Sequence, residues 1–281
     1  MTSDTEVITR TGKIRIHDEA GFEGMRKAGR VVAECLDMII PYVVPDVTTE
    51  SVDKLIYEFV MDNGASSATI GYHGYRHASC ISVNHVVCHG IPSERRFKNG
   101  DIANIDVTVV VDGWHGDSSR MYGLGDVKRK AERLMDVTYE SLMAGIATVK
   151  PSARVGDIGG AISAVAARNR VSVVDMFCGH GLGQVFHDEP NVVHSAKAGT
   201  GPVLEPGMFF TIEPMLNLGK KDCGVLSDGW TATTRDRSLS AQFEHSLAVT
   251  ENGVEIFTLS PTGQHTPHNP DLGAKIPIPG Q

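Results

Sequence analysis

Three aspartates stand in a stretch that otherwise favours β-structure, IDVTVVVDGWHGDSS over residues 105–119: Asp106, Asp112 and Asp117. Strands usually exclude Asp, so each of them needs a reason. The dipeptide Asp112-Gly113 lies between two β-rich runs and predicts a two-residue hairpin turn. In that register Asp106 opposes Ser119, and Asp117 lies two residues along on the same face. We therefore expect two carboxylates to project from one face of one hairpin.

A close pair of carboxylates has a chemical consequence if it is buried. Val107 and residues 109–111 form an apolar run that indicates a strand buried on both faces. Like charges held close together away from water resist joint ionisation, unless a cation lies between them. Asp106 and Asp117 thus either hold a metal ion or lie on a solvated strand face, and the hairpin alone leaves both interpretations open.

The second half of the sequence adds polar residues in apolar surroundings. Glu213 ends the strand-like FFTIEP, and Glu244 lies inside a strand-like pattern. His180 lies in CGHGLG, where glycines let other groups approach the backbone, and His187 follows seven residues later. His89 stands in VCHGIP. Taken singly, such a His is more often a core or turn residue than a ligand, and a lone strand Glu usually faces solvent.

Two segments of the chain resemble each other. Residues 100–106 and residues 207–213 each begin with a Gly before a strand-like stretch, and each ends with a carboxylate after an Ile. The carboxylates are Asp106 and Glu213. The match is short enough to arise by chance, but it also fits two similar halves that each donate an acid to a shared centre.

Other chemistries lack the spacing that they need. The sequence GHGLG has neither the G-x-G-x-x-G spacing nor the downstream Lys of a phosphate-binding loop. Residues 180–188 do not match H-E-x-x-H, which argues against the metal-binding helix of a zincin. No G-x-S-x-G elbow occurs, which argues against a serine hydrolase. Cys88 and His89 are adjacent, and adjacent strand residues point to opposite faces, so they make a poor catalytic dyad.

Apolar spacing predicts the elements that must position these residues. Stripes of helical period predict helices over residues 22–39, 49–63, 128–149 and 155–167. Residues 67–90 are expected to be strand and loop, and short strands dominate from Met176 onward, among them one over residues 241–249. Asn252-Gly253 predicts a late hairpin.

Composition narrows the class of protein. The chain has 281 residues, 41% hydrophobic and 21% charged, which fits a globular protein with a sizeable core. Its formal net charge of −8 argues against nucleic acid as a specific partner. Five cysteines without a C-x-x-C pair favour reduced thiols and a cytoplasmic location. No apolar run long enough to span a membrane and no secretory signal is visible, so no membrane partner is expected.

Five motifs together resemble the methionine aminopeptidases of metallopeptidase family M24, in their bacterial type I form. They are NIDVT, HGDSS, GHGLG, TIEPM and QFEHS, in the family's order and spacing, and the resemblance covers about residues 16–260. It implies an α/β (α+β) pita-bread fold, in which two pseudo-symmetric halves with a curved, mostly antiparallel sheet are covered by helices. Such a fold would explain the internal similarity.

The resemblance assigns roles residue by residue. It makes Asp106, Asp117, His180, Glu213 and Glu244 the ligands of two divalent metal ions, and this donor set suits Co, Mn, Fe or Zn. A hydroxide activated by both ions would attack the first peptide bond of a chain that begins with Met before a small residue. Glu213 would also handle protons, and His89 and His187 would contact the substrate and stabilise the intermediate.

The resemblance also implies a pocket for the Met side chain. Its wall would comprise Tyr72, Tyr75, Cys80, Phe186 and Trp230, although Tyr75 could equally be an ordinary core aromatic. A monovalent-cation site would comprise Asn84, Val86 and Ser240.

Two positions depart from the family pattern near the pocket. Arg76 stands where relatives usually have Pro, and Thr69 replaces a Cys found in several members. We expect changes at the pocket rim from these departures and no change in the metal ligands.

We expect three regions along the chain: a flexible lead-in (residues 1–15), one catalytic domain (16–260) and a flexible Pro- and Gly-rich tail (261–281). The expected substrate is the N-terminal Met of nascent polypeptides near the ribosome exit, and the expected state is a monomer. An X-Pro aminopeptidase on the same fold usually carries a large N-terminal domain, for which His180 lies too early. A binding protein of the proliferation-associated type would have lost metal ligands, whereas all five positions are filled.

Overall fold

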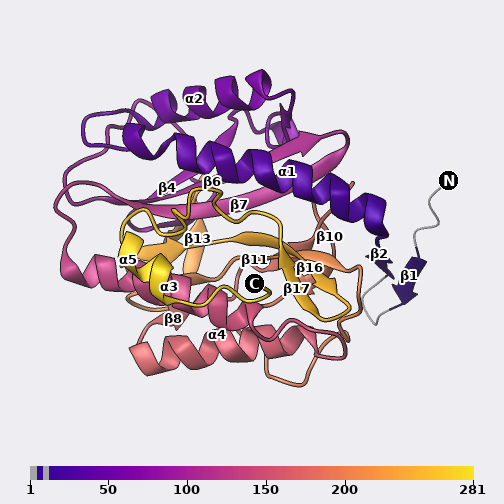
Figure 1. Ribbon diagram of the computed structural model, residues 1–281. Helices are drawn as coiled ribbons and strands as arrows, with labels where there is room; N and C mark the ends of the chain where they lie inside the picture. Colours follow the sequence, from indigo (N-terminus) through magenta and orange to yellow (C-terminus); the bar gives the residue numbers. More distant parts are fainter. Residues whose placement is uncertain (1–4, 9–12) are drawn as a thin grey trace.

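Two layers of helices enclose the strands of the protein (Figure 1). The computed structural model describes residues 5–8 and 13–281. The four predicted helices form close to their predicted spans: α1 (Glu19–Met38), α2 (Thr49–Asp62), α3 (Arg129–Ile146) and α4 (Val155–Asn169). Helices α1 and α2 lie on one side of the strands and α3 and α4 on the other. Asp18 and Thr48 begin the first two helices by accepting backbone N–H bonds with their side chains.

The predicted hairpin forms in the predicted register. Asp106 pairs with Ser119, and Asp117 pairs with Thr108. The turn residue Asp112 has a φ of 49°, in the left-handed region that a two-residue hairpin turn requires. The two long strands are β6 (Ile102–Val111) and β7 (Trp114–Gly123), which share a sheet with β3 (Ser66–Ser67) and β4 (Ser79–Val83).

Helices α1 and α2 bury one face of this first sheet. Val32, Leu36 and Ile56 from the helices pack with Ile105 and Val107 from β6, all fully buried. The closest approach is at Gly116, where a Cβ atom would lie 2.5 Å from the backbone of Ala28. A Gly next to Asp117 is therefore what allows α1 to lie directly on β7.

Strands of the second half build three further sheets, one of which also includes β5 of the first half. One contains five strands, β10 (Asp188–Val192), β9 (Gly179–Gly181), β11 (Phe209–Ile212), β16 (His245–Thr250) and β17 (Gly253–Ile256). The other two join β15 (Ser240–Gln242), β12 (Met215–Asn217) and β8 (Ser172–Val173), and β13 (Cys223–Val225), β14 (Ala232–Thr234) and β5 (Val86–Cys88). Helices α3 and α4 pack against the five-stranded sheet and against the sheet of β15, β12 and β8, through the larger core cluster. The predicted late hairpin is confirmed as β16 and β17.

The two halves meet where the strand predicted over residues 241–249 is broken. That strand is not continuous, because β15 ends at Gln242 and β16 begins at His245. Glu244 lies in the break, where its N–H donates to the Ser119 carbonyl of β7 at 3.0 Å. The Ser118 hydroxyl donates to the Glu244 carbonyl at 2.6 Å. The backbone of Glu244 thus hydrogen-bonds to β7 and not to a strand of its own sheet, and this contact joins the two halves.

The C-terminal segment is packed, so the flexible tail expected over residues 261–281 is wrong. It contains helix α5 (Pro270–Lys275), and its apolar residues Leu272 and Ile276 lie against the larger core. The His268 ring lies 3.0 Å from the Asp136 carboxylate of α3. The apolar residues between the prolines explain the difference, because burying them stabilises an ordered path across the core.

A buried ion pair between helix α1 and strand β7 also binds the start of this C-terminal segment. Arg120 of β7 is 1% exposed and pairs with the Asp37 carboxylate of α1. The second oxygen of Asp37 accepts from the hydroxyls of Ser260 at 2.8 Å and Thr262 at 2.6 Å. The C-terminal segment therefore begins by completing the hydrogen bonds of a buried charge.

The N-terminal region is also partly structured. Of the lead-in expected to be flexible over residues 1–15, the structure describes β1 (Thr5–Ile8) and β2 (Lys13–Ile16), which pair antiparallel. Ile14 is 1% exposed and belongs to the larger core, which fixes β2. The rest of that expectation lies outside the described residues. Over the described chain, none of the helices has the length and apolar character to cross a membrane.

Candidate metal centre and substrate cavity

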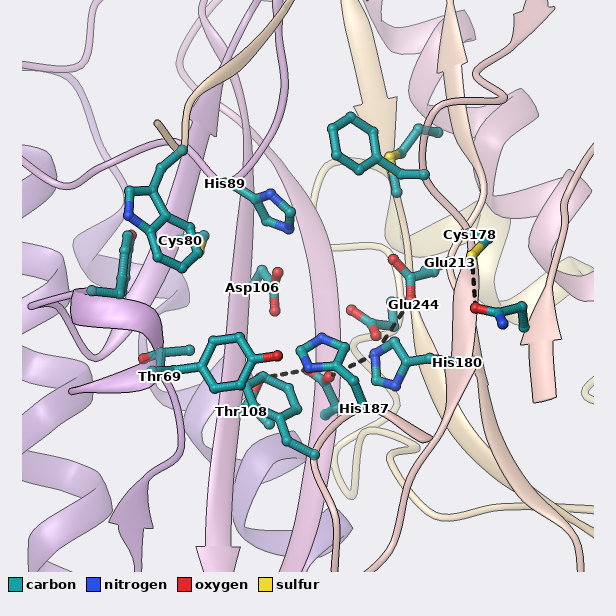
Figure 2. Close-up of a pocket in the computed structure, with 18 of the residues that line it drawn as sticks. Thr69, Cys80, His89, Asp106, Thr108, Cys178, His180, His187, Glu213 and Glu244 are labelled. Atoms are coloured by element: carbon teal, nitrogen blue, oxygen red, sulfur yellow. Dashed lines mark hydrogen bonds and ion pairs between the residues drawn. The ribbon is translucent and has the colours of Figure 1, made fainter. Parts of the chain in front are cut away.

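A cavity of about 660 Å³ opens between the two halves of the protein. Every residue that the sequence analysis placed in the metal centre, the catalytic set or the Met pocket lines this one cavity. Figure 2 shows Glu213, Glu244 and His180 on one side of it, Thr69 and Cys80 on the other, and Asp106 between them. Residues between Tyr72 and Glu244, scattered over many elements, thus converge on one space.

Four carboxylates and one imidazole gather in this cavity. The ligand atoms of Asp117, His180 and Glu244 lie within 4.8 Å of one another. The Nε2 atom of His180 is 3.6 Å from an Asp117 oxygen and 3.7 Å from a Glu213 oxygen. Figure 2 shows Asp106 facing Glu213 and Glu244 across the cavity. The hairpin supplies two of these acids, and the second half supplies the other three groups.

Burial makes this set of charges costly without a cation. It raises the pKa of Asp106 well above its usual range, with the Asp117 charge adding to the effect. Burial also raises the pKa of Asp117 to about 7, and that of Glu213 and Glu244 well above the ordinary value. The His180 ring is driven to the neutral form, with its pKa lowered to about 4 by burial. The neutral imidazole is already in the form that a metal ligand needs, whereas the acids would lose their protons when a divalent ion binds.

The donor set fits a metal. Oxygen and imidazole ligands suit borderline and hard divalent ions, and such ions would neutralise acids that otherwise repel one another. Cys80 lies beside Asp106 on the neighbouring strand β4, but burial raises its pKa well above the usual value. A thiol that stays protonated is a poor metal ligand, so the site is an oxygen and nitrogen site.

Hydrogen bonds from neighbouring strands orient the acids. The Thr108 hydroxyl donates to Asp117 at 2.7 Å, directly across the hairpin. The Thr211 hydroxyl donates to Glu213 at 2.8 Å and accepts from the His180 N–H at 3.0 Å. Such partners hold these groups in the orientations that a bound metal ion would need.

Sequence reasoning missed these supporting residues, although a signal for two of them existed. Thr108 opposes Asp117 in the predicted hairpin register, and Thr211 lies two residues before Glu213 on the same strand face. His194 carried no such signal. Its Nε2 atom accepts the Glu213 N–H at 3.1 Å, and only the fold brings residues 194 and 213 together.

His89 and His187 also line the cavity, and Figure 2 shows His89 beside Asp106 and His187 beside His180. The His187 ring centroid lies 4.2 Å from that of His180. Burial lowers the pKa of His187 to about 3, helped by neighbouring imidazoles, and burial alone lowers that of His89. Both rings are therefore neutral near pH 7, when each can donate one hydrogen bond and accept another.

Aromatic side chains close the rest of the cavity. Tyr72 lies against Phe186 at a centroid distance of 4.9 Å, and Tyr75 lies against Trp230 at the same distance. Tyr75 is 4% exposed, and its hydroxyl donates to the Ser79 carbonyl at 2.9 Å, away from the acids. The wall is thus apolar where it faces the cavity, as a thioether side chain would require.

The three residues expected to hold a monovalent cation lie outside this cavity. Asn84 and Ser240 are joined by a backbone hydrogen bond of 2.9 Å, and Val86 begins strand β5 nearby. The Ser240 hydroxyl is buried without a hydrogen-bond partner among the described residues. A monovalent cation bound by Asn84, Val86 and Ser240 stays a prediction.

The two departures from the family pattern lie on the loop before β4. Thr69 lines the cavity, and its hydroxyl donates to the His77 carbonyl at 2.7 Å. Arg76 is exposed and points into a separate surface hollow beside α2. Thr69 therefore fixes the loop that carries Tyr72 and Tyr75, whereas Arg76 does not reach the acids.

Comparisons with known proteins agree over most of the chain. The sequence model for "Metallopeptidase family M24" matches residues 23–251. The methionine aminopeptidase of Rickettsia prowazekii is 54% identical over 250 residues, which is 88% of this chain and 96% of the relative. That of Escherichia coli K12 is 50% identical over 248 residues, 88% of this chain and 94% of the relative. The crystal structure of the Rickettsia prowazekii protein matches with a TM-score of 0.87 at 53% identity, covering 88% of this chain and 100% of that one.

Proposed function

The chain belongs to metallopeptidase family M24 as a bacterial type I methionine aminopeptidase, and from that premise we propose that it releases N-terminal Met when the next residue is small. It is a metallo-aminopeptidase, a hydrolase that binds divalent metal. The observation that carries the finer proposal is the cavity itself. Buried acids and His180 line it together with an apolar aromatic wall.

Asp106, Asp117, His180, Glu213 and Glu244 are the residues that we assign to two divalent ions of Co, Mn, Fe or Zn. The number of buried carboxylates supports two ions, since one divalent ion would leave part of the negative charge uncompensated. When bound, such ions would acidify a water molecule and polarise the scissile carbonyl.

Glu213 is the residue that we assign to proton transfer. One of its oxygens accepts from Thr211 at 2.8 Å, and the other accepts from the Gln242 amide at 3.3 Å. Burial raises its pKa well above the ordinary value, which brings a carboxyl group closer to the range in which it can take up and release a proton.

His89 and His187 are the residues that we assign to the substrate amide. Both are neutral near pH 7 and line the same cavity as the acids. A neutral imidazole N–H aimed at the scissile carbonyl stabilises the negative charge that develops there. The wall of Tyr72, Phe186 and Trp230 would hold the Met side chain by apolar contact.

The test is an assay of metal-stripped protein on the tripeptide Met-Ala-Ser, with and without added Mn(II) or Co(II). Release of free Met only after metal addition is the expected result. Ala-Pro-Ala serves as the matched peptide, because an X-Pro aminopeptidase on this fold would cleave it instead. Failure to cleave Met-Ala-Ser under every metal would overturn the proposed specificity while leaving the family intact.

Replacing His89 by Ala is expected to lower kcat by about 10²- to 10³-fold and to leave metal binding unchanged. The reason is that His89 lines the cavity but is not among the five residues that we assign to the metal ions. Steady-state kinetics and calorimetric titration with Mn(II) check the two parts separately. Loss of the metal in this variant would show that our separation of ligands from substrate contacts is wrong.

A further inference from the structure

The loop that carries His187 has no regular secondary structure of its own. It runs from Leu182 to His187, between strands β9 and β10. A loop ordinarily samples several conformations, yet a residue that contacts the reacting amide must be held in place to within a fraction of an ångström. Contacts from another element must therefore fix this loop.

One residue of β7 makes two hydrogen bonds to this loop. The backbone N–H of His115 donates to the Gly183 carbonyl at 2.8 Å. The Nδ1 atom of the His115 ring lies 2.8 Å from the same oxygen. Because a carbonyl only accepts, Nδ1 is the protonated ring nitrogen, and both donors of one residue converge on one acceptor.

The His115 ring also reaches His187 through a stack of rings. It is stacked on Phe186 at a centroid distance of 5.6 Å and an interplanar angle of 15°. Phe186 is stacked in turn on His187 at 4.0 Å and 29°. His115 itself does not line the cavity, so it does not touch the substrate.

The close approach of the loop to β7 depends on Gly183. This residue has a φ of +152°, and a Cβ atom there would lie 3.2 Å from the His17 ring. Glycine therefore lets the carbonyl reach His115 with the loop in contact with the core. The loop is attached to the same strand that carries Asp117, two residues further on.

We propose that His115 is a positioning residue that holds His187 against the substrate amide through the Gly183 carbonyl and the Phe186 ring. The inference rests on the role that the proposed function gives to His187. The hairpin thus sets both the metal ligand Asp117 and, through His115, a group that contacts the substrate from the opposite half of the chain.

A purely structural role for His115 would predict a different result. In that case removing the His115 side chain would weaken the fold or the whole cavity. Its effect on kcat/KM would then multiply with the effect of a second substitution such as His187→Ala. A positioning role predicts that the effect of His115 disappears once His187 is gone, because nothing remains to be positioned.

The experiment is a double-mutant cycle on kcat/KM for Met-Ala-Ser with the Mn(II)-loaded enzyme. We expect His115→Ala to lower kcat/KM about tenfold, the size of one lost hydrogen bond and one ring contact. We expect His187→Ala to lower it about 10²-fold or more. The double variant should be no worse than His187→Ala alone.

His89 provides the matched control within the same cavity. Its ring contacts Phe177 and Trp230 and neither His115 nor Phe186. The effects of His115→Ala and His89→Ala should therefore multiply. If the effects of His115→Ala and His187→Ala also multiply, the positioning role is wrong. If His187→Ala keeps full activity, the role of His187 in the proposed function is wrong instead.

Two conservative variants keep the test informative if His115→Ala folds poorly. His115→Phe retains the stack on Phe186 and loses the ring donor, whereas His115→Asn retains a donor near Nδ1 and loses the stack. Each should lose about two- to tenfold in kcat/KM, less than His115→Ala, with Mn(II) affinity unchanged. Wild-type kinetics in both variants would overturn the proposal.

Discussion

Replacing Asp106 by Asn is expected to lower kcat by about 10³-fold or more, the largest effect of any single change considered for this chain. The substitution keeps the shape of the side chain but removes a negative oxygen from a site that we assign to two divalent ions. Such ions contribute several kcal/mol of charge stabilisation during hydrolysis, and each 1.4 kcal/mol is about tenfold in rate.

We expect the parent protein to be more stable than Asp106→Asn when metal is bound, and less stable than Asp106→Asn when metal is removed. Without metal, burial and the neighbouring Asp117 raise the pKa of Asp106, so near neutral pH folding must either protonate this carboxyl group or bury its charge. Asn carries no such cost, so the variant should be the more stable protein. With saturating Mn(II), the parent gains binding free energy that the variant cannot match, so the parent should be the more stable. Urea unfolding of both proteins, with and without Mn(II), measures all four stabilities.

The control for Asp106→Asn is Asp112→Asn on the same hairpin. Asp112 is a turn residue with a φ of 49°, a conformation that Asn also adopts readily. It should change neither the rate nor the metal dependence of stability. If Asp106→Asn kept kcat within tenfold of the parent, the assignment of Asp106 as a ligand would be wrong.

Replacing Asp37 by Ala is expected to destabilise the protein by about 3–5 kcal/mol. Arg120 is 1% exposed and pairs with this carboxylate, so the substitution leaves a buried guanidinium without its counter-charge. It also removes the acceptor for the Ser260 and Thr262 hydroxyls. The free energy of urea unfolding in the metal-free protein measures the loss without interference from metal binding.

Two further variants distinguish the charge pair from other causes. Asp62→Ala, at the exposed end of α2, should change stability by less than about 0.5 kcal/mol. The double substitution Asp37→Leu with Arg120→Met removes both charges and should recover much of the loss. If Asp37→Ala lost as little unfolding free energy as Asp62→Ala, the ion pair of Asp37 and Arg120 would not be important for stability.

The pH dependence of stability follows from the same pair. Burial opposes ionisation of Asp37, but the Arg120 charge and the hydrogen bonds from Thr262, Arg120 and Ser260 outweigh it and lower its pKa. A carboxyl whose pKa is lowered by folding stabilises the protein above its unfolded pKa of about 3.9. That stabilisation is lost as pH falls through the lowered pKa, and Asp37→Asn should remove this part of the acid dependence.

Local sequence was enough to predict the parts of the site that one segment builds. The dipeptide Asp112-Gly113 fixes the turn, and the turn fixes the register that places Asp106 and Asp117 on one face. The four helices were predicted because their apolar stripes have the helical period. The pita-bread fold was implied by the five motifs, and the match to the Rickettsia prowazekii structure confirms it.

Features that depend on contacts between distant segments were not predicted. The strand pattern around Glu244 gave no sign of a break, because the break is caused by bonding to Ser119 and Ser118 in the other half. The Pro- and Gly-rich composition of the tail suggested flexibility, and only the surface under Leu272 and Ile276 explains its order. His115 was missed because its partner Gly183 lies 68 residues away.

The hydrogen bonds of Asp37 have a consequence for the order in which the chain can fold during its synthesis. Asp37 and Arg120 emerge early, but the two hydroxyls that complete the carboxylate lie 223 and 225 positions after it. In a growing chain that stops short of Ser260, water takes the place of both hydroxyls, and the chain lacks the roughly 1.5–3 kcal/mol that a hydrogen bond to a charged group contributes. The packing of α1 against β7 therefore reaches its full stability only after Ser260 and Thr262 have been synthesised.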